Sequence, residues 1–429
     1  MKRLVKVLGA ALAGIAVCTA LAVWLVLRAS LPQLDGQRKI TGLSAPVTLQ
    51  RDDKGVPTIS GATRADLARA LGFAHAQDRF FQMDLQRRAA AGELSALLGA
   101  SLLTVDEQLR PHRFRAVARA AVAALDARQR ALLEGYAEGV NAGLAALGSR
   151  PFEYWLLRSK PEPWKAEDSV LCMQAMFLEL QDPSGHRILQ DGLLRATLPP
   201  AAAAFVLAGA PEWDAAADGS TSEAPMLPTT DQFDLRVQHD LPYALPADVR
   251  HQLGGLGSNN WAVSGARTAS GAALIANDMH LGFRVPIIWY RVRLVQKSAG
   301  LDATGVTLPG TPALVAGSNG HVAWGFTNSY GQYESVIRLV PGDGPDEFRT
   351  AQGVERLVTV EEPIAVKGEG THHLKVKLSP WGPVMGKDWA GRPYVLEWTA
   401  QDPAALNLNL MSMEHAMSVS AAIDEAAGF

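Results

Sequence analysis

A serine directly follows a glycine near the middle of the chain, in the run from Gly254 to Gly265 that reads GGLGSNNWAVSG. A serine hydroxyl is a weak nucleophile unless a base lies beside it, and an N-terminal serine carries such a base in its own α-amino group, whose pKa is about 7.7–8. Ser258 would become N-terminal if its hydroxyl attacked the Gly257 carbonyl and water opened the resulting ester. A glycine on the acyl side gives the backbone the freedom that such a strained bond requires. The pattern is therefore compatible with self-cleavage between Gly257 and Ser258 and with a nucleophile that needs no His–Asp pair.

The same residues have two simpler interpretations. A Gly-Ser-Asn run also forms an ordinary turn before a strand, because small and polar residues favour turns. A serine hydrolase with a His–Asp relay is the other interpretation, but its nucleophile normally lies in a Gly-x-Ser-x-Gly elbow, and the sequence contains no such motif. The pattern alone leaves a choice between a turn and a self-cleaving nucleophile.

Composition limits the classes to which the chain can belong. Its 429 residues are 48% hydrophobic and 19% charged, so the chain can bury a sizeable core. A net charge of −3 argues against a nucleic-acid-binding surface. The two cysteines, Cys18 and Cys172, lie far apart and supply no disulfide framework. The fold must therefore rest on its apolar core.

Residues 1–30 carry a membrane signal. Lys2, Arg3 and Lys6 precede an uncharged run over residues 7–27, which Arg28 closes. A run of this length spans a bilayer as one helix, and the preceding cations place its N-terminus in the cytoplasm. A cleaved signal peptide has a shorter apolar region that ends in small residues, whereas this run ends in Trp-Leu-Val-Leu. The sequence predicts a retained single-pass anchor with the remaining chain in the periplasm; a buried core helix is the alternative.

Residues 31–200 carry mainly helical patterns. Thr63 is followed three residues later by Asp66, which is a helix-capping signature, and apolar residues then recur at helical spacing. Further helices are expected over residues 113–147 and 167–180. This part of the chain is therefore predicted to be a helical region.

Two polar residues on the first of these helices need an explanation. His75 and Asp78 would act either as metal ligands or as members of a hydrogen-bonded polar network. No further ligand accompanies them at helical spacing, which favours the network.

The pattern changes twice after residue 200. Residues 201–257 include an Ala-, Ser- and Pro-containing stretch with little to bury, which is typical of a linker. In residues 258–429, short apolar or alternating runs bounded by Gly and Pro predict strands, and Ser318-Asn319-Gly320 is a hairpin signal between two of them. Helices first and strands later indicate an α+β fold.

Several motifs resemble, in the same order, those of the penicillin acylase family of N-terminal-nucleophile hydrolases. The resemblance covers the chain from about residue 30 to its end, which makes it more specific than a lone Gly-Ser-Asn. The motifs are RDDKGVP at 51–57, ALGFAHAQDR at 70–79, QMDL at 82–85, GSNNWAVSG at 257–265, ANDMHL at 276–281, PGTP at 309–312 and AWGFTN at 323–328.

This resemblance implies a fold and a subunit organisation. The family fold is an αββα sandwich of two stacked antiparallel sheets between helices, with the nucleophile at the start of an inner strand. Residues 31–200 would be the small subunit, residues 201–257 a spacer peptide, and residues 258–429 the N-terminal part of the large subunit. The two subunits would remain together as a heterodimer after cleavage.

The resemblance also implies roles for individual residues. Ser258 would attack the substrate amide carbonyl and form an acyl-enzyme, with its own α-amino group as the base. The backbone N–H of Asn328 would be one oxyanion donor, a contribution of about 3–4 kcal/mol per donor in other acyl-transfer enzymes. His280 stands where penicillin G acylases carry glutamine and where cephalosporin and acyl-homoserine-lactone acylases commonly carry histidine. It would help to hold the amino end of Ser258.

The chain departs from the family pattern at a metal site. In calcium-binding members acidic residues follow the oxyanion donor, whereas Gln332 and Ser335 stand at the corresponding positions of this sequence. Calcium prefers several oxygen ligands with negative charge. No metal and no other cofactor is therefore expected.

A second departure concerns the C-terminus. In the family, the segment resembling residues 417–422 is soon followed by an asparagine that supplies the second oxyanion donor, and then by a long further region. The sequence ends at Phe429. The resemblance implies either part of a longer protein or a split relative that another chain must complete.

The function implied by the resemblance is removal of an acyl group from a small N-acyl compound. Candidate substrates are N-acyl-homoserine lactones, which the histidine at 280 favours, and β-lactam side chains. Phe283, Ile287, Trp289 and Phe326 would line an apolar acyl pocket, although a buried core would explain the same residues. The alternative is a membrane-anchored structural or interaction protein that keeps the fold without the activity.

Overall fold

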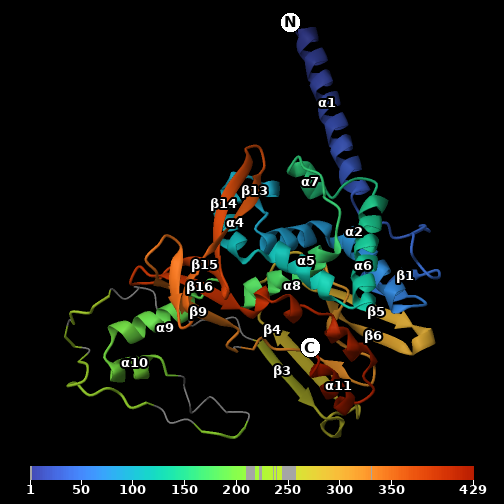
Figure 1. The fold of residues 1–429 in the computed structure, drawn as a ribbon. Coiled ribbons are helices and arrows are strands. Elements are labelled where there is room, and N and C mark those ends of the chain that lie inside the picture. Colours follow the sequence, from blue (N-terminus) through green and yellow to red (C-terminus); the bar gives the residue numbers. More distant parts are fainter. Residues whose placement is uncertain are drawn as a thin grey trace.

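The computed structural model describes residues 2–208, 218–221, 225–234, 236, 237, 239–243, 258–329 and 331–429. Helix α1 (Lys2–Ala29) extends away from the body of the protein, in which helices lie between sheets (Figure 1). Residues before 208 form mainly helices and residues after 258 form mainly strands. The structure is thus a mixture of helices and sheets in the order that the sequence predicts.

Helix α1 has 28 residues, none of them buried. Within the described part of the chain it is the one helix that is long and apolar enough to cross a membrane. The predicted apolar helix is therefore present, and by length and composition it fits either a membrane anchor or a signal sequence.

The helical region is built around α2 (Arg64–Ala91). Thr63 caps this helix, since its side chain accepts a hydrogen bond from the Asp66 backbone N–H, and Gly92 ends it in the left-handed conformation with φ 63°. The predicted helical tract over residues 113–147 is two helices, because Leu125 is extended and Asp126 caps the second one. The other described helices are α3 (Ser95–Leu98), α4 (Leu103–Leu109), α5 (Phe114–Ala124), α6 (Ala127–Ala146), α7 (Phe152–Leu156), α8 (Ala166–Leu180), α9 (His186–Thr197), α10 (Pro200–Val206) and α11 (Val419–Ala426).

A six-stranded sheet has the order β1-β2-β5-β6-β7-β8. Strands β2 and β5 run parallel, whereas β5–β6, β6–β7 and β7–β8 are antiparallel. Tyr290, Val292 and Leu294 alternate with exposed Arg291 and Arg293 along β5, as the period-two pattern predicts. These strands are β1 (Thr48–Arg51), β2 (Pro57–Ser60), β5 (Tyr290–Gln296), β6 (Leu301–Thr307), β7 (Leu314–Ser318) and β8 (Ala323–Trp324).

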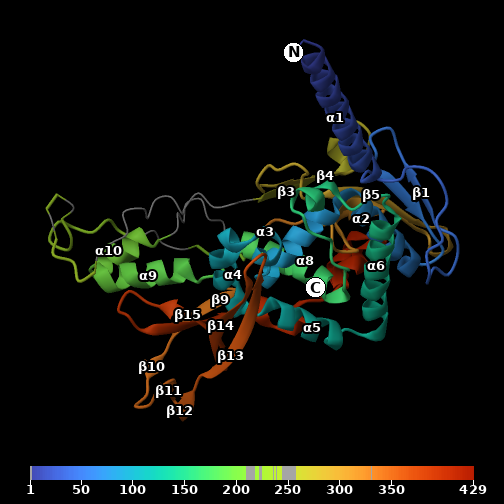
Figure 2. The same ribbon diagram turned by 90° about the horizontal axis from the view of Figure 1, so that it is seen from above.

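A five-stranded sheet has the order β13-β14-β15-β16-β9 and lies across the helices from β1 and β5 (Figure 2). A three-stranded sheet, β10-β11-β12, lies beside it, and β3 and β4 pair with each other. The strands are β3 (Ser258–Val263), β4 (Leu274–Met279), β9 (Glu334–Arg338), β10 (Val340–Pro341), β11 (Glu347–Thr350), β12 (Gly353–Arg356), β13 (Val358–Val366), β14 (Gly370–Ser379), β15 (Gly382–Lys387) and β16 (Pro393–Trp398).

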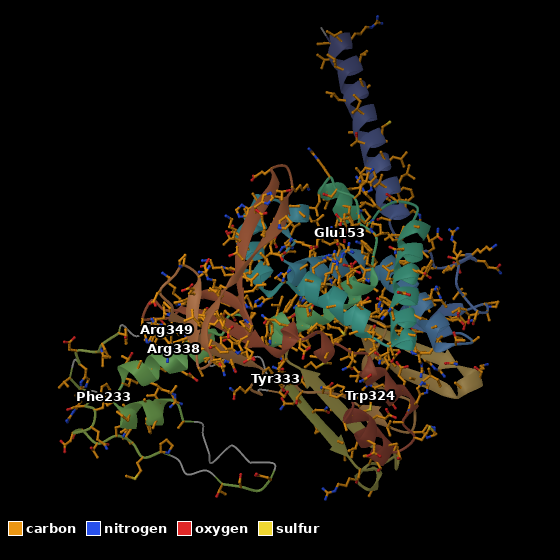
Figure 3. The ribbon with its side chains drawn as sticks, in the orientation of Figure 1. Glu153, Phe233, Trp324, Tyr333, Arg338 and Arg349 are labelled. Carbon is orange, nitrogen blue, oxygen red and sulfur yellow. The ribbon has the colours of Figure 1, made fainter. Side chains whose placement is uncertain are left out.

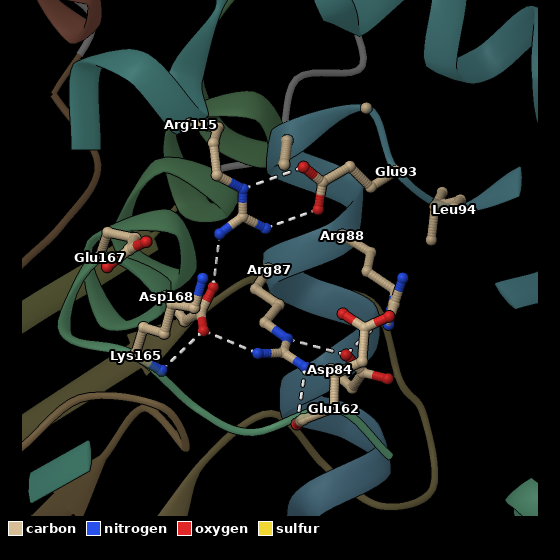
Figure 4. A network of polar contacts seen from close by, with 12 residues as sticks. Asp84, Arg87, Arg88, Glu93, Leu94, Arg115, Glu162, Lys165, Glu167 and Asp168 are labelled. Carbon is tan, nitrogen blue, oxygen red and sulfur yellow. Dashed lines mark hydrogen bonds and ion pairs between the residues drawn. The ribbon is translucent and has the colours of Figure 1, made fainter. Parts of the chain in front are cut away.

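Buried charges tie α2 to its neighbours (Figure 4). Asp84 is fully buried and accepts hydrogen bonds from Arg87 Nε at 2.8 Å, Arg88 Nε at 2.9 Å and the Tyr154 hydroxyl at 2.5 Å. Arg87 also donates to Asp168 on α8 at 2.7 Å. Asp84, Arg87 and Asp168 thus each have an opposite charge in contact, which offsets the cost of removing them from water.

Helices α2 and α6 cross closely because glycines line their contact. A Cβ atom at Gly139 would lie 1.9 Å from the Arg69 carbonyl oxygen, and one at Gly72 would lie 2.3 Å from the Tyr136 carbonyl oxygen. At Gly135, one turn earlier on α6, the nearest atom to a Cβ is Arg69 Nη1 at 3.5 Å, an ordinary contact. The two helices can therefore approach at Gly139 only without a side chain there.

Alanine at these two positions of α6 is expected to have opposite effects. Gly139→Ala should lower the free energy of unfolding by about 1–3 kcal/mol, because the backbones must separate. Gly135→Ala should leave stability unchanged or raise it by up to about 1 kcal/mol, because alanine favours the helix. Urea unfolding followed by circular dichroism measures both. Equal destabilisation by the two substitutions would contradict the close crossing.

Candidate active site

Ser258 is the first residue of β3 and pairs with Met279, the last residue of β4. His280 follows Met279 directly, so the antiparallel register brings Ser258 and His280 to the same end of the two-stranded sheet. Gly257, the other residue of the predicted cleavage site, lies outside the described residues. The structure thus places Ser258 opposite the residue that precedes the predicted histidine.

Asn277 connects this sheet to the segment that contains Asn328. Its side-chain amide donates to the Phe326 carbonyl at 2.9 Å, and its Oδ1 accepts from the Phe326 backbone N–H at 3.2 Å. A Cβ atom at Gly325 would lie 2.7 Å from Asn277 Oδ1, so the contact requires a glycine there. Asn277 also pairs with Asn260 of β3. One side chain therefore holds the segment beside the strands that carry Ser258 and His280.

A hydrogen bond to the helical region holds Asn328. Its side-chain amide donates to the Leu180 carbonyl at 3.1 Å, at the last residue of α8. The last carbonyls of a helix have no partner within the helix, so this bond satisfies one of them. Two regions far apart in the sequence, residues 166–180 and 326–328, therefore meet at the predicted oxyanion donor.

His280 faces solvent and has one carboxylate partner. Its Nε2 lies 3.2 Å from Asp278 Oδ2, and the two side chains are 45% and 63% exposed. Both residues belong to the end of β4 or follow it directly. Asp278 can orient the imidazole.

The four residues predicted to line an acyl pocket do not line the cavity found beside α2. Phe283 is fully exposed, Ile287 and Phe326 are exposed, and Trp289 is half-buried. None of the four lines the cavity of about 920 Å³ that lies between α2, α7, α8 and residues 284–286. Phe326 instead packs against Phe429, with ring centroids 6.3 Å apart.

Gln332 and Ser335, which stand where calcium-binding relatives carry acidic residues, lie before and within β9. Neither side chain carries charge, which is a poor match to a hard cation. Within the described ranges, no group of three or more His, Cys, Asp and Glu side chains could hold a metal ion. The side chains at these two positions therefore do not fit a calcium ion.

His75 and Asp78 belong to a buried polar network. His75 Nδ1 lies 2.7 Å from the Tyr136 hydroxyl and Nε2 lies 2.9 Å from Thr307 Oγ1. The Tyr290 hydroxyl donates to Asp78 at 2.6 Å. Every polar atom of the His75 ring thus has a hydrogen-bond partner, as the network interpretation requires.

Burial, together with the positive charge of Arg79, lowers the pKa of His75 from 6.5 to about 3. Below pH 6.5 the unfolded chain binds a proton at this residue and the folded chain does not. The free energy of unfolding therefore decreases as the pH is lowered. The loss is about 2 kcal/mol between pH 7 and pH 5. Urea unfolding at both pH values measures it, and a His75→Gln variant should lose less between the two. Equal losses in the two proteins would contradict the prediction.

Asn277 and Thr307 did not emerge from the sequence as contacts of the site and the network. Asn277 is a polar residue in the strand Leu274–Met279, and the three residues before it are apolar. That interruption is the available sequence signal, because most side-chain hydrogen bonds are made to the backbone or to water. Nothing local distinguishes Thr307 from any other strand threonine.

Comparison with known proteins points to the same family as the sequence motifs. Residues 46–429 match the family described as penicillin amidase. The penicillin acylase 2 proenzyme of Pseudomonas sp. (strain SE83) is 34% identical over 373 residues, which cover 84% of this chain and 46% of that protein. The acyl-homoserine lactone acylase QuiP of Pseudomonas aeruginosa is 32% identical over 389 residues, which cover 86% of this chain and 43% of that protein.

A solved structure of the thermostable penicillin G acylase from Alcaligenes faecalis is 30% identical over 35% of this chain and 83% of that chain, with a TM-score of 0.32. The chain spans less than half the length of the two acylases from Pseudomonas, at 46% and 43%. The family match nevertheless covers residues 46–429, nearly the whole sequence. The chain therefore belongs to the penicillin amidase family.

Proposed function

We propose that the chain carries the nucleophile of an amide hydrolase that transfers an acyl group to Ser258 and then to water. The observation that supports this most directly is the position of Ser258 at the start of β3, opposite Met279, which directly precedes His280. The contact between Asn277 and Phe326 adds a fixed segment with Asn328 two residues further on. Nucleophile, orienting histidine and oxyanion donor are then supplied by neighbouring elements.

The reaction runs in two halves. The hydroxyl oxygen of Ser258 forms a bond to the amide carbonyl carbon while its proton passes to the α-amino group of the same residue. The backbone N–H of Asn328 stabilises the negative charge on the carbonyl oxygen. The C–N bond breaks, the leaving amine takes the proton, and water then hydrolyses the ester. His280 positions the amino end of Ser258.

This chemistry requires Ser258 to be N-terminal. Self-cleavage between Gly257 and Ser258 would produce it, with residues 31–200 in a small subunit, residues 201–257 as spacer and residues 258–429 in the large subunit. One relative is named a proenzyme, which supports processing of this kind. The two subunits would stay together as a heterodimer.

Small N-acyl compounds are the proposed substrate class. The names of two relatives, an acyl-homoserine lactone acylase and a penicillin acylase, support N-acyl-homoserine lactones and β-lactam side chains. Histidine at position 280 favours the lactone. Helix α1 would anchor the enzyme in the cytoplasmic membrane with the catalytic region in the periplasm.

Free amine released from N-acyl-homoserine lactones of increasing chain length, and from a phenylacetyl amide, tests this function. The protein should be expressed from its natural gene with whatever follows Phe429, and Ser258→Ala serves as the blank. Release above that blank for at least one acyl group is expected. Failure on every aliphatic and aromatic acyl amide would overturn the proposal and favour a structural role.

A further inference from the structure

Helix α7 lies beside the base of α1 (Figure 1). The Ser149 backbone N–H donates to the Ala29 carbonyl at 2.9 Å, and Gly148 lies against Ala29. Leu31 and Phe152 line the same cavity beside the end of α1. The segment of residues 148–160 is therefore fixed to the point at which α1 leaves the body of the protein.

One face of α7 is buried and the other is apolar but exposed. Tyr154 is fully buried and bonded to Asp84, so it fixes which face of the helix points inward. With about 3.6 residues per turn, Phe152 and Leu156 point roughly opposite to Tyr154. Phe152, Trp155 and Leu156 are 44%, 47% and 75% exposed. Neighbouring large apolar side chains on a surface mark a contact site.

Positive charges flank these apolar side chains. Residues 148–160 contain Arg150, Arg158 and Lys160 against the single carboxylate Glu153. Arg150 lies over the Trp155 ring at 3.9 Å. Burial raises the pKa of Glu153. This residue lies on the side of the body from which α1 extends (Figure 3). The segment is therefore cationic. Protein surfaces at the membrane–water interface are typically rich in aromatic and basic side chains.

The end of α1 has the same composition. Arg28 lies over the Trp24 ring at 5.8 Å, in the last turns of the helix. A helix of 28 residues is about 42 Å long, whereas the hydrocarbon core of a bilayer is about 30 Å thick. If α1 spans the bilayer, its last turns reach the lipid headgroups. Helix α7, joined to Ala29, then lies at the same level.

We propose that an anchor-side patch, formed by Leu31, Phe152, Trp155 and Leu156 with Arg150, Arg158 and Lys160, rests on the bilayer surface that α1 crosses. The apolar side chains enter the headgroup region, and the cations contact anionic headgroups. The proposal rests on the membrane anchor proposed above and is independent of the acylase chemistry. It gives the protein a fixed orientation on the membrane, which a single helix followed by a flexible segment would not give.

Nitroxide labels on single cysteines test the patch in the full chain. Leu156→Cys and, as a matched control, Val354→Cys on β12 are labelled in a Cys18→Ala background; both side chains are more than half exposed. Cys172 is fully buried, and burial raises the pKa of its thiol, so it stays unlabelled. The proteins are inserted in vesicles with equal amounts of phosphatidylcholine and phosphatidylglycerol. Collisions of each label with oxygen and with a water-soluble nickel complex are then measured.

The label at 156 is expected to favour oxygen over the nickel complex severalfold more than the label at 354 does. The preference should fall when Arg158 and Lys160 are both changed to glutamate, or when phosphatidylglycerol is left out. Protein that floats with the vesicles but leaves the label at 156 in water would overturn the patch while keeping the anchor. A label shielded from both reagents would mean that another part of the protein or a second copy covers α7, which also overturns the proposal. Protein that fails to float would refute the anchor and the patch together.

Discussion

Replacing Ser258 with alanine is expected to leave the chain in one piece and to abolish acyl transfer. Without the hydroxyl, nothing at this position can attack the Gly257 carbonyl, and no acyl-enzyme can form. In a serine hydrolase the loss of the nucleophile lowers kcat by a factor on the order of 10⁶. The natural chain should instead yield a fragment whose N-terminal sequence is Ser-Asn-Asn-Trp. Intact mass and N-terminal sequencing distinguish the two results.

Ser258→Cys is the matched variant, because a thiol of similar size keeps a nucleophile at the first position of β3. It should still be cut at the same bond, even if it turns over substrate slowly. A fragment beginning at residue 258 in the alanine variant would show that another protease makes the cut. That result would remove the proposed self-cleavage and leave the role of Ser258 in catalysis to be tested by amine release.

Replacing Asp84 with alanine is expected to lower the free energy of unfolding by about 3–5 kcal/mol. Asp84 is fully buried and contacts Arg87, Arg88 and Tyr154. Arg87 would keep Asp168, but Arg88 would keep only the exposed Glu162 at 3.4 Å. The cost arises mainly from a buried guanidinium that has lost its close partner.

Asp343→Ala is the control for this substitution. Asp343 forms an ion pair with Arg349 at 2.8 Å, but its side chain is 91% exposed. Solvent screens such a pair, so its removal should cost less than about 1 kcal/mol. Urea unfolding of the three proteins gives the comparison. Similar losses for the two variants would show that the buried network in Figure 4 does not stabilise the fold.

Local patterns in the sequence predicted several elements for which neighbouring residues decide the structure. Thr63 caps α2 through Asp66, and the apolar run before Arg28 forms one helix. The Asn319 side chain accepts bonds from the His321 and Val322 backbone N–H groups and closes the predicted turn between β7 and β8. In each case the determining contacts span only a few residues, so a short window of sequence contains them.

Contacts between distant residues escaped prediction for the opposite reason. Asp126 caps α6 through the Gln129 backbone N–H and so divides the helical pattern at Leu125, but the pattern does not show that α6 then packs on α2. Phe283 is apolar and was expected in a pocket, but its surroundings leave it in solvent. Burial depends on what the rest of the fold places against a side chain.

By itself, the sequence determined the family, the order of helices before strands, the apolar N-terminal helix, and Ser258 as the residue to examine. The tertiary structure alone decided that Asn277 holds Phe326 and that Asn328 meets the end of α8, across separations of 49 and 148 residues. The physical reason is that side-chain hydrogen bonds act over about 3 Å. Only the folded chain brings such distant residues within that range.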